Sequence, residues 1–388
     1  MSINRHFIWM PALAALACSV AMAADIRVGP NESIQRIADA ARLAQDGDTV
    51  TILPGHYRGD VALWQQDRLT IRGLGDGPVL DADGQSVEGK AIWVIRGGTI
   101  VIDNITFRGA RVAHFNGAGI RFERGKLTVR SSRFVDNETG IMTSNDPNAR
   151  LQIENCTFSR APRHAGALHH LLYVGRIAYF SLRGSRVEGG YNAHLVKSRA
   201  QTQRIEYNWL VDGPDGEASY SLEFPEGGAA TVIGNIIGQS ASTSNLTLIS
   251  YGAEGYRWPD NRLVLSHNTL INDRSGGGRF LQVWQHDAHA APTVMARNNL
   301  LVGVGVFALG NPGEFIPNPG LVLATDRNDA DAYRLERDSL LRGHVEAAPM
   351  WRGIALQPTH EFAPPAGTRP LTAPRRWAPG AFQTPPAQ

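Results

Sequence analysis

Apolar and polar residues alternate in short stretches that recur from about residue 100 to residue 310. An apolar residue at every second position is the period of a β-strand with one buried face. Each copy of the recurring phrase contains Asn or Ser followed by further apolar positions, as in "IENCTFSRA" and "LSHNTLIND". The marker residues are Asn104, Ser132, Asn155, Ser185, Asn208, Asn235, Asn268 and Asn299. Their similar but variable spacing indicates one repeated unit with loops of different length.

A single repeat of this size cannot bury its own apolar face, so successive copies must stack. Stacking in register places Asn over Asn at a turn, where a side-chain amide can bond to the backbone of the next copy. No segment between residues 100 and 310 has a convincing helical period. The pattern predicts an all-β protein with one right-handed parallel β-helix over residues 24–338.

An amphipathic helix is predicted at about residues 31–46, before the first repeat. Its apolar positions are Ile34, Ile37, Ala38, Ala41 and Leu43. Asn31 or Ser33 is expected to cap its start, and Gly47 to end it. Such a helix would cover the open N-terminal end of the solenoid, whose first coil would otherwise expose its core.

The stretch "GDTVTILPGHYRG" that follows this helix is similar to a marker of the pectin-lyase-like β-helix superfamily. The resemblance covers about residues 25–320 and implies the same fold. From residue 339 to 388 the chain is instead rich in Pro and has no period. We expect this tail to lie extended along the solenoid, with Phe362, Trp377 and Phe382 as anchors.

The first 23 residues have the pattern of a secretory signal peptide. Arg5 precedes an apolar run to Val20, and Ala21-Met22-Ala23 offers a cleavage site. A lipid anchor at Cys18 and a membrane anchor are the alternatives, but the run is short for a membrane span and no second span follows. A periplasmic or secreted protein is therefore expected.

Charge and cysteine content restrict the partners of the exported chain. The formal net charge of the whole sequence is only +2, so no overall field would recruit nucleic acid. Cys156 is the one cysteine left after cleavage, so no internal disulfide is expected. We expect a monomer with no membrane span, and an acidic polysaccharide as its partner.

Candidate chemistry gathers on four segments that precede successive markers. Aligning Leu171, Leu195, Leu222 and Leu248 as inward residues brings polar side chains of neighbouring coils onto one surface. These side chains are His169, His170, Tyr173, His194, Lys197, Arg199, Tyr220, Glu223, Tyr251 and Glu254. Such a mixture suits proton transfer and the binding of a carboxylate.

The stretch "VKSRAQTQRIEYNWLVDG", followed by "SLEFPEGGAATVIGNIIGQ", resembles the alginate lyase and chondroitinase B family of polysaccharide lyases. The resemblance implies that Lys197 is the base of a β-elimination. The family's arginine on the next coil has no match, since Leu222 and Glu223 occupy that region. Its acidic calcium ligands also have none, since Gly189, Gly190 and Asn192 stand there.

The resulting prediction is a lyase that cleaves a polysaccharide containing uronic acid. Lys197 would take the C5 proton, if crowding by Arg199 and His194 lowers its pKa. Arg199 or His194 would bind the carboxylate, and Tyr173 or Tyr220 would protonate the leaving oxygen. Glu223 would orient Lys197, which argues against a lysine base. We expect His170, Tyr220, Tyr251 and Glu254 to contact substrate.

Two other functions remain open at this point. A glycoside hydrolase could use Glu223 with Glu254 or Glu217 as its pair of carboxylates. A non-catalytic scaffold could hold polysaccharide through the same basic and aromatic groups. No cofactor is expected: His169 and His170 are adjacent and cannot easily share one ion with His194. Calcium is possible, for example at the turn of residues 143–149, without a specific signal.

Overall fold

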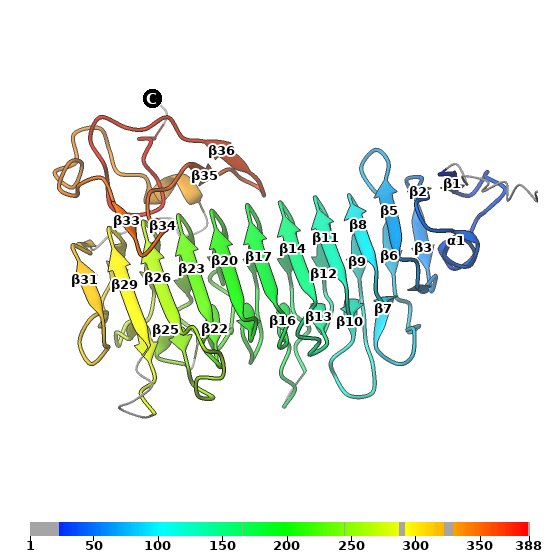
Figure 1. Cartoon of the computed structure of the whole chain (residues 1–388), viewed down its shortest axis with the longest axis horizontal. Coiled ribbons are helices and arrows are strands. Elements are labelled where there is room, and N and C mark those ends of the chain that lie inside the picture. Colours follow the sequence, from blue (N-terminus) through cyan, green and yellow to red (C-terminus); the bar gives the residue numbers. More distant parts are fainter. Residues whose placement is uncertain (1–22, 165, 244, 287–291, 322–328, 387–388) are drawn as a thin grey trace, which may run out of the picture.

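The computed structural model describes residues 23–164, 166–243, 245–286, 292–321 and 329–386. Over these residues the chain winds into an elongated solenoid whose walls are three parallel sheets (Figure 1). Each complete coil adds one strand to every sheet, so that a strand pairs with its counterparts in the coils before and after. The predicted all-β solenoid is confirmed.

The sheets contain strands in strict order of coils. The first sheet consists of β1 (Asp25–Val28), β2 (Thr49–Ile52), β5 (Arg68–Gly73), β8 (Thr99–Asp103), β11 (Lys126–Arg130), β14 (Arg150–Glu154), β17 (Tyr179–Arg183), β20 (Thr202–Glu206), β23 (Ala229–Ile233), β26 (Arg262–Ser266), β29 (Thr293–Arg297) and β31 (Glu314–Ile316). The second sheet consists of β3 (His56–Arg58), β6 (Val79–Asp81), β9 (Thr106–Arg108), β12 (Arg133–Val135), β15 (Thr157–Ser159), β18 (Arg186–Glu188), β21 (Trp209–Val211), β24 (Ile236–Gln239), β27 (Thr269–Asn272), β30 (Leu300–Gly303) and β32 (Gly320–Leu321). The third sheet consists of β4 (Ala62–Trp64), β7 (Ala91–Ile95), β10 (Ala118–Phe122), β13 (Thr139–Thr143), β16 (Leu172–Val174), β19 (Val196–Ser198), β22 (Leu222–Phe224), β25 (Thr247–Tyr251) and β28 (Arg279–Val283).

The interior is a continuous apolar column because inward residues of one coil lie directly over those of the next. Phe107, Phe134 and Phe158 occupy equivalent positions of β9, β12 and β15 and are fully buried. Their rings are nearly parallel, with centroids 5.0 and 4.6 Å apart. Such stacks add to the stabilisation from area burial.

A buried ladder of Asn side chains runs through the C-terminal half. The side-chain oxygen of Asn235 accepts the backbone N–H of Asn208, and its amide donates to the oxygen of Asn268. Asn268, Asn299 and Asn318 continue this pattern. The ladder therefore satisfies polar groups at the bend of each coil, where a buried unpaired amide would be costly.

The marker assignment is wrong by one residue at two of the eight positions. Asn104 and Asn155 have positive φ angles of 56° and 55°, and their neighbours Ile105 and Cys156 occupy the ladder position. The backbone N–H groups of Ile105 and Cys156 donate to the hydroxyls of Ser132 and Ser185, in the coils that follow. Asn tolerates a left-handed backbone, so it fits either of these adjacent positions.

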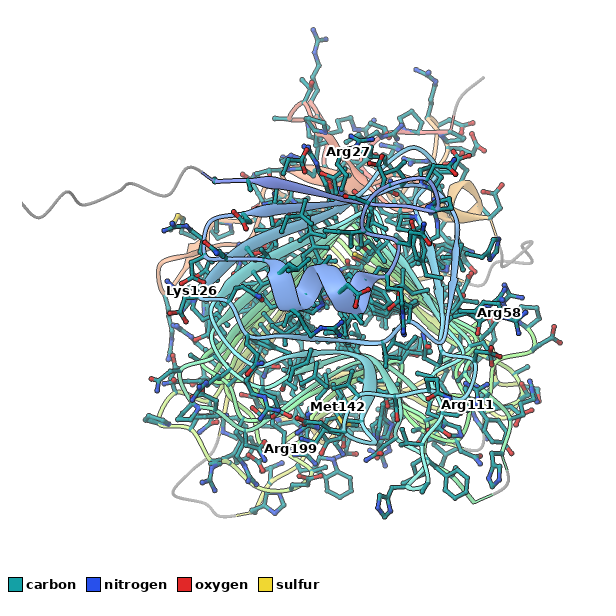
Figure 2. The ribbon with its side chains drawn as sticks, turned by 90° about the vertical axis from the view of Figure 1, so that its right-hand side faces the viewer. Arg27, Arg58, Arg111, Lys126, Met142 and Arg199 are labelled. Carbon is teal, nitrogen blue, oxygen red and sulfur yellow. The ribbon has the colours of Figure 1, made fainter. Side chains whose placement is uncertain are left out.

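The N-terminal end is covered by α1 (Ile37–Leu43), which lies across the solenoid axis (Figure 2). Its first residues are not capped by Asn31 or Ser33. The carboxylate of Asp60 instead accepts the N–H groups of Ile37 and Ala38, at 2.6 and 3.0 Å. The helix is shorter than predicted and ends before Gly47. Leu43 is 59% exposed, so it does not belong to the buried face.

The C-terminal segment packs along the edge where the first and second sheets meet, away from the third sheet (Figures 1 and 2). Its elements are η1 (Ala330–Tyr333), β33 (Met350–Trp351), β34 (Ile354–Ala355), β35 (His360–Phe362) and β36 (Thr368–Pro370). Phe362 and Phe382 are buried in a cluster with Trp209 and Ile236 of the second sheet. Trp377 lies against the ring of His267, with centroids 5.5 Å apart.

A buried carboxylate organises this tail. Glu361 is fully buried and accepts hydrogen bonds from the side chains of Arg334, Arg369 and Thr384. It also accepts from the backbone N–H of Gln383. A buried charge with this many donors is compensated, so the tail holds a defined conformation over the solenoid.

The predicted signal peptide lies outside the described residues, apart from Ala23. Among the helices of the described ranges, none combines the length and apolar character needed to cross a bilayer.

We expect replacement of Asn235 by Ala to lower the free energy of unfolding by about 3 kcal/mol or more, because it leaves several buried donors and acceptors without partners. Urea unfolding would measure the loss, with the exposed Asn148→Ala as the control. A midpoint like that of the control would show that the ladder contributes little.

Candidate active site

The outer face of the third sheet carries two columns of side chains in consecutive coils, most of them polar. In the first column Met142, Tyr173, Lys197 and Glu223 are paired in register across β13, β16, β19 and β22. Their side chains alternate with the inward residues Leu172, Val196 and Leu222, which are fully buried. The sheet therefore brings Tyr173, Lys197 and Glu223 together at the spacing of adjacent strands, about 4.8 Å.

The second column is a stack of three rings beside the first. The centroid of His194 lies 4.9 Å from that of His170 and 4.8 Å from that of Tyr220. The backbone N–H of His194 donates to Nδ1 of His170, and the N–H of Tyr220 donates to Nδ1 of His194, both at 3.3 Å. Since Nδ1 is an acceptor in each ring, a neutral imidazole must carry its proton on Nε2.

Lys197 lies between two carboxylates. Its Nζ is 3.0 Å from Oε2 of Glu223 and 3.2 Å from Oε1 of Glu254. Nε2 of His194 is also 3.0 Å from Oε2 of Glu223. Both contacts converge on this one oxygen, so His194 and Lys197 hold Glu223 together. The surroundings of Lys197 thus differ from the predicted crowding by like charges, because acidic groups contact it directly.

Arg199 binds the other side of Glu254. Its Nε lies 2.9 Å from Oε2 and one terminal nitrogen lies 2.7 Å from Oε1, which is bidentate recognition of a carboxylate. The other terminal nitrogen donates to the hydroxyl of Tyr173 at 2.7 Å. The side chain of Glu254 is 42% exposed, whereas that of Glu223 is 4% exposed.

The carboxylates of Glu223 and Glu254 both stay ionised because neighbouring side chains outweigh the effect of burial on their pKa values. Burial alone would raise the pKa of Glu223, but His194 and Lys197 outweigh it and lower the pKa. For Glu254, burial also acts upward, and Arg199 with Lys197 lowers the pKa below its usual value. Burial holds the pKa of His170 well below its usual value, and the neighbouring His194 and Lys197 add to this effect.

Eight of the nine predicted site residues meet on this face: Tyr173, His170, His194, Lys197, Arg199, Tyr220, Glu223 and Glu254. Tyr251 does not, and its assignment to substrate binding is wrong. It pairs with Phe224 at an inward position, is fully buried, and donates to the carbonyl of Gly228. The error came from aligning Leu222 with Leu195 and Leu248 in the sequence. In the structure Leu222 pairs with Val196 and Ile249 instead, so Ile249 and Tyr251 both point inward.

Sequence reasoning missed a second ion pair at the rim. Nε of Arg176 lies 2.9 and 2.8 Å from the two oxygens of Glu226, which is nearly buried and 3.7 Å from Arg199. Arg176 follows Tyr173 by three positions, and Glu226 follows Glu223 by three. Tyr173 and Glu223 both belong to the first column. The correct register would have revealed this pair. Glu217, the other proposed carboxylate, pairs with Arg163 instead.

Groups of three or more His, Cys, Asp or Glu side chains that could hold a metal ion do not occur in the described ranges. On the N-terminal side of the ring stack lies a cavity of about 430 Å³, lined by Asn116, Arg121, Thr139, Met142, His170 and Tyr173. It extends the polar face along the solenoid axis.

Comparison with solved structures identifies the fold. A crystal structure of pectate lyase Pel9A matches with a TM-score of 0.52 and 13% sequence identity, over 94% of this chain and 97% of that chain. The fold is a pectin-lyase-like right-handed parallel β-helix. The A-module of mannuronan C-5 epimerase AlgE4 from Azotobacter vinelandii matches with a TM-score of 0.38 and 14% identity, over 73% of this chain and 94% of that chain. No family model matches the sequence, and a search of curated proteins finds no match.

The ion pairs of Glu223 predict a pH-dependent stability of the β-helix. Because the pKa of Glu223 is lower in the folded protein, its contribution is present at pH values above the unfolded pKa of about 4.3. The contribution is lost as the pH falls through the folded value. We expect Glu223→Gln to lose roughly 1–3 kcal/mol of unfolding free energy at pH 7 and to approach wild type at pH 3.

Urea unfolding at several pH values measures this difference. The control is Glu314→Gln, on the exposed strand β31. A deficit of Glu223→Gln that stays constant from pH 7 to pH 3 would contradict the ionic role.

Proposed function

We propose that this protein is an exported lyase that cleaves a polysaccharide containing uronic acid by β-elimination. The observation that carries the proposal is the carboxylate of Glu254, held by Arg199 on two nitrogens and by Lys197. This carboxylate is partly exposed and comes from the segment between β25 and β26. A uronate carboxylate of similar size and charge could replace it on the same cations.

The position of Lys197 supports its role as the base. A uronate bound to Arg199 in place of Glu254 brings its C5 hydrogen, one carbon from the carboxylate, next to Nζ of Lys197. Arg199 would neutralise the carboxylate and so stabilise the negative charge that develops when the proton leaves. Lys197 must act as the neutral amine, and we therefore expect the rate to rise from neutral towards alkaline pH.

Tyr173 is placed to supply the second proton. Its hydroxyl oxygen accepts a hydrogen bond from Arg199, so its own hydrogen is directed elsewhere and is available to the leaving oxygen. In the reaction the C5–H and C4–O bonds break, a C4–C5 double bond forms, Lys197 gains the C5 proton, and Tyr173 donates one to the departing sugar. Solvent then restores both residues.

His170 and His194 are better suited to binding the substrate than to removing its C5 proton. Nδ1 of His170 and Nδ1 of His194 each accept a backbone N–H. Taking up a proton would cost each ring this hydrogen bond, and burial already disfavours the charged form of His170. The Nε2–H group of His194 would instead donate to Glu223, and that of His170 to an oxygen atom of the polymer.

A glycoside hydrolase is less compatible with this site. It needs one carboxyl group that stays protonated as a general acid, with a raised pKa. Glu223 and Glu254 both have lowered pKa values. The match in fold to a protein named pectate lyase is compatible with elimination.

Replacing Lys197 by Ala tests the base. On uronate polymers and acidic exopolysaccharides we expect wild type to produce an ultraviolet absorbance from the new double bond. Lys197→Ala should lower kcat by about 10²–10⁴-fold. Lys126→Ala, which changes an exposed lysine on the first sheet (Figure 2), should act like wild type.

Other outcomes distinguish the alternatives. Full activity of Lys197→Ala would show that another residue is the base. New reducing ends without absorbance would identify a hydrolase. Retention of polymers without cleavage would identify a binding scaffold.

Replacing Glu254 by Ala tests its role as a stand-in for substrate. A substrate carboxylate must displace it from Arg199 and Lys197, and such charged hydrogen bonds are worth about 1.5–3 kcal/mol. We expect KM to fall by roughly ten-fold or more and kcat to change little. The exposed Asp338→Asn, in the C-terminal segment, provides the control. A loss of kcat as large as that of Lys197→Ala would instead place Glu254 in the chemical step.

A further inference from the structure

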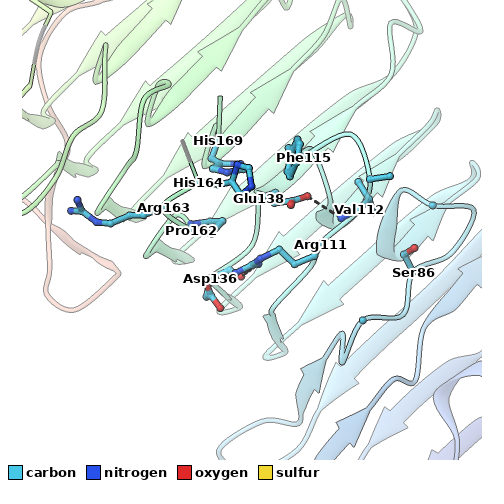
Figure 3. Close-up of a pocket in the computed structure, with 13 residues that line it drawn as sticks. Ser86, Arg111, Val112, Phe115, Asp136, Glu138, Pro162, Arg163, His164 and His169 are labelled. Carbon is cyan, nitrogen blue, oxygen red and sulfur yellow. Dashed lines mark hydrogen bonds and ion pairs between the residues drawn. The ribbon is translucent and has the colours of Figure 1, made fainter. Parts of the chain in front are cut away.

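A second cavity, of about 790 Å³, lies beside the candidate active site and has no role in the proposed reaction. His169 lines it, while the adjacent His170 belongs to the ring stack on the third sheet. Residues 111–113, Phe115 and residues 162–164 form other walls. Figure 3 shows His164, His169, Phe115 and Glu138 around this space.

His169 is buried in this wall with its polar groups unused. Only 1% of the residue is exposed, and neither ring nitrogen has a hydrogen-bond partner. Burying such a ring without partners costs free energy, and most buried polar groups in proteins are paired. A neutral imidazole offers one donor and one acceptor. Both nitrogens are covered in the free protein, so a ligand with hydroxyl groups would reach them only when the ring turns towards the cavity.

Phe115 presents an aromatic surface at the cavity at a cost in backbone strain. It is 43% exposed and has a φ of 56°, a region that non-glycine residues rarely adopt. Its ring lies against that of His164, with centroids 4.3 Å apart and an angle of 32°. Strained backbone of this kind costs about 1–3 kcal/mol and is found preferentially at functional sites.

The charges at this cavity are already neutralised by the protein. Arg111 pairs with Asp136 at 2.6 Å. Glu138 accepts the backbone N–H groups of Val112 and Gly117, at 3.0 and 2.7 Å. Arg163 pairs with Glu217. Each arginine that lines the cavity is thus paired with a carboxylate of the protein, and the buried carboxylate of Glu138 would repel an anionic ligand.

We propose that this cavity binds a neutral sugar residue. The apolar face of a pyranose ring would stack on Phe115, since an aromatic ring gives a large contact area with few torsions to fix. Its hydroxyl groups would donate to and accept from the free nitrogens of His169. The protein would then hold a polymer at two places of different chemistry, a carboxylate on the third sheet and an uncharged sugar in the cavity.

Binding to neutral polysaccharides tests this site without relying on the proposed elimination. The probes are glucan, mannan, galactan and xylan, each cast into a native gel, with polygalacturonate as the acidic comparison. We expect at least one neutral polymer to retard wild type. Lys197→Ala should be retarded equally, because the cationic residues of the third sheet are not part of this site.

Two substitutions should weaken that binding by about ten-fold or more while the fold persists. Phe115→Gly removes the ring, and glycine adopts the positive φ without strain, so Tm should be unchanged or higher. His169→Leu removes the two free nitrogens and leaves no buried polar group unpaired. Phe115→Trp keeps the stacking surface, and His114→Ala changes an exposed neighbour outside the cavity; both should bind like wild type.

The proposal is overturned if none of the four neutral polymers retards wild type. It is also overturned if folded Phe115→Gly binds as wild type does. Retardation by polygalacturonate alone, lost in Lys197→Ala, would assign all binding to the third sheet.

Discussion

The stacking of each coil in register with the next is the constraint on which the rest of the structure depends. A parallel strand has unpaired N–H and C=O groups on both edges. In the solenoid these groups are satisfied by the equivalent strands of the preceding and the following coil. The buried amides of Asn208, Asn235 and Asn268 add a side-chain connection at the bend. Any slip by one residue would break these bonds and turn apolar residues outward.

The same constraint creates the chemistry of the third sheet. Coils stacked in register place Tyr173, Lys197 and Glu223 one strand apart, without any of them being close in sequence. The backbone N–H groups of the neighbouring coils also fix the protonated nitrogen of His170 and His194. The order of the coils in the sheet thus determines which charged groups become neighbours.

Much of this could be predicted from sequence, because alternation and a repeated Asn report directly on stacking. The fold, and the gathering of eight candidate residues on one face, followed from these patterns. The errors arose where two adjacent residues satisfy the same pattern. Asn104 fits a left-handed turn as well as a ladder position. Leu195 and Val196 are both apolar and both buried, so the alignment of leucines slipped by one, and Tyr251 was placed outward. The contact of Glu254 with Arg199 depends on the path of a loop, which no strand periodicity describes.

The position of the tail also affects how the protein can reach its final structure. Trp209 is covered by Tyr333 and Phe362, with ring centroids 6.2 and 6.3 Å away, and Phe382 belongs to the same cluster. Coils made early in synthesis therefore keep an apolar surface uncovered until almost the whole chain has emerged. During that interval the surface is open to association with other chains. A polypeptide shortened near its C-terminus would remain in this vulnerable state permanently.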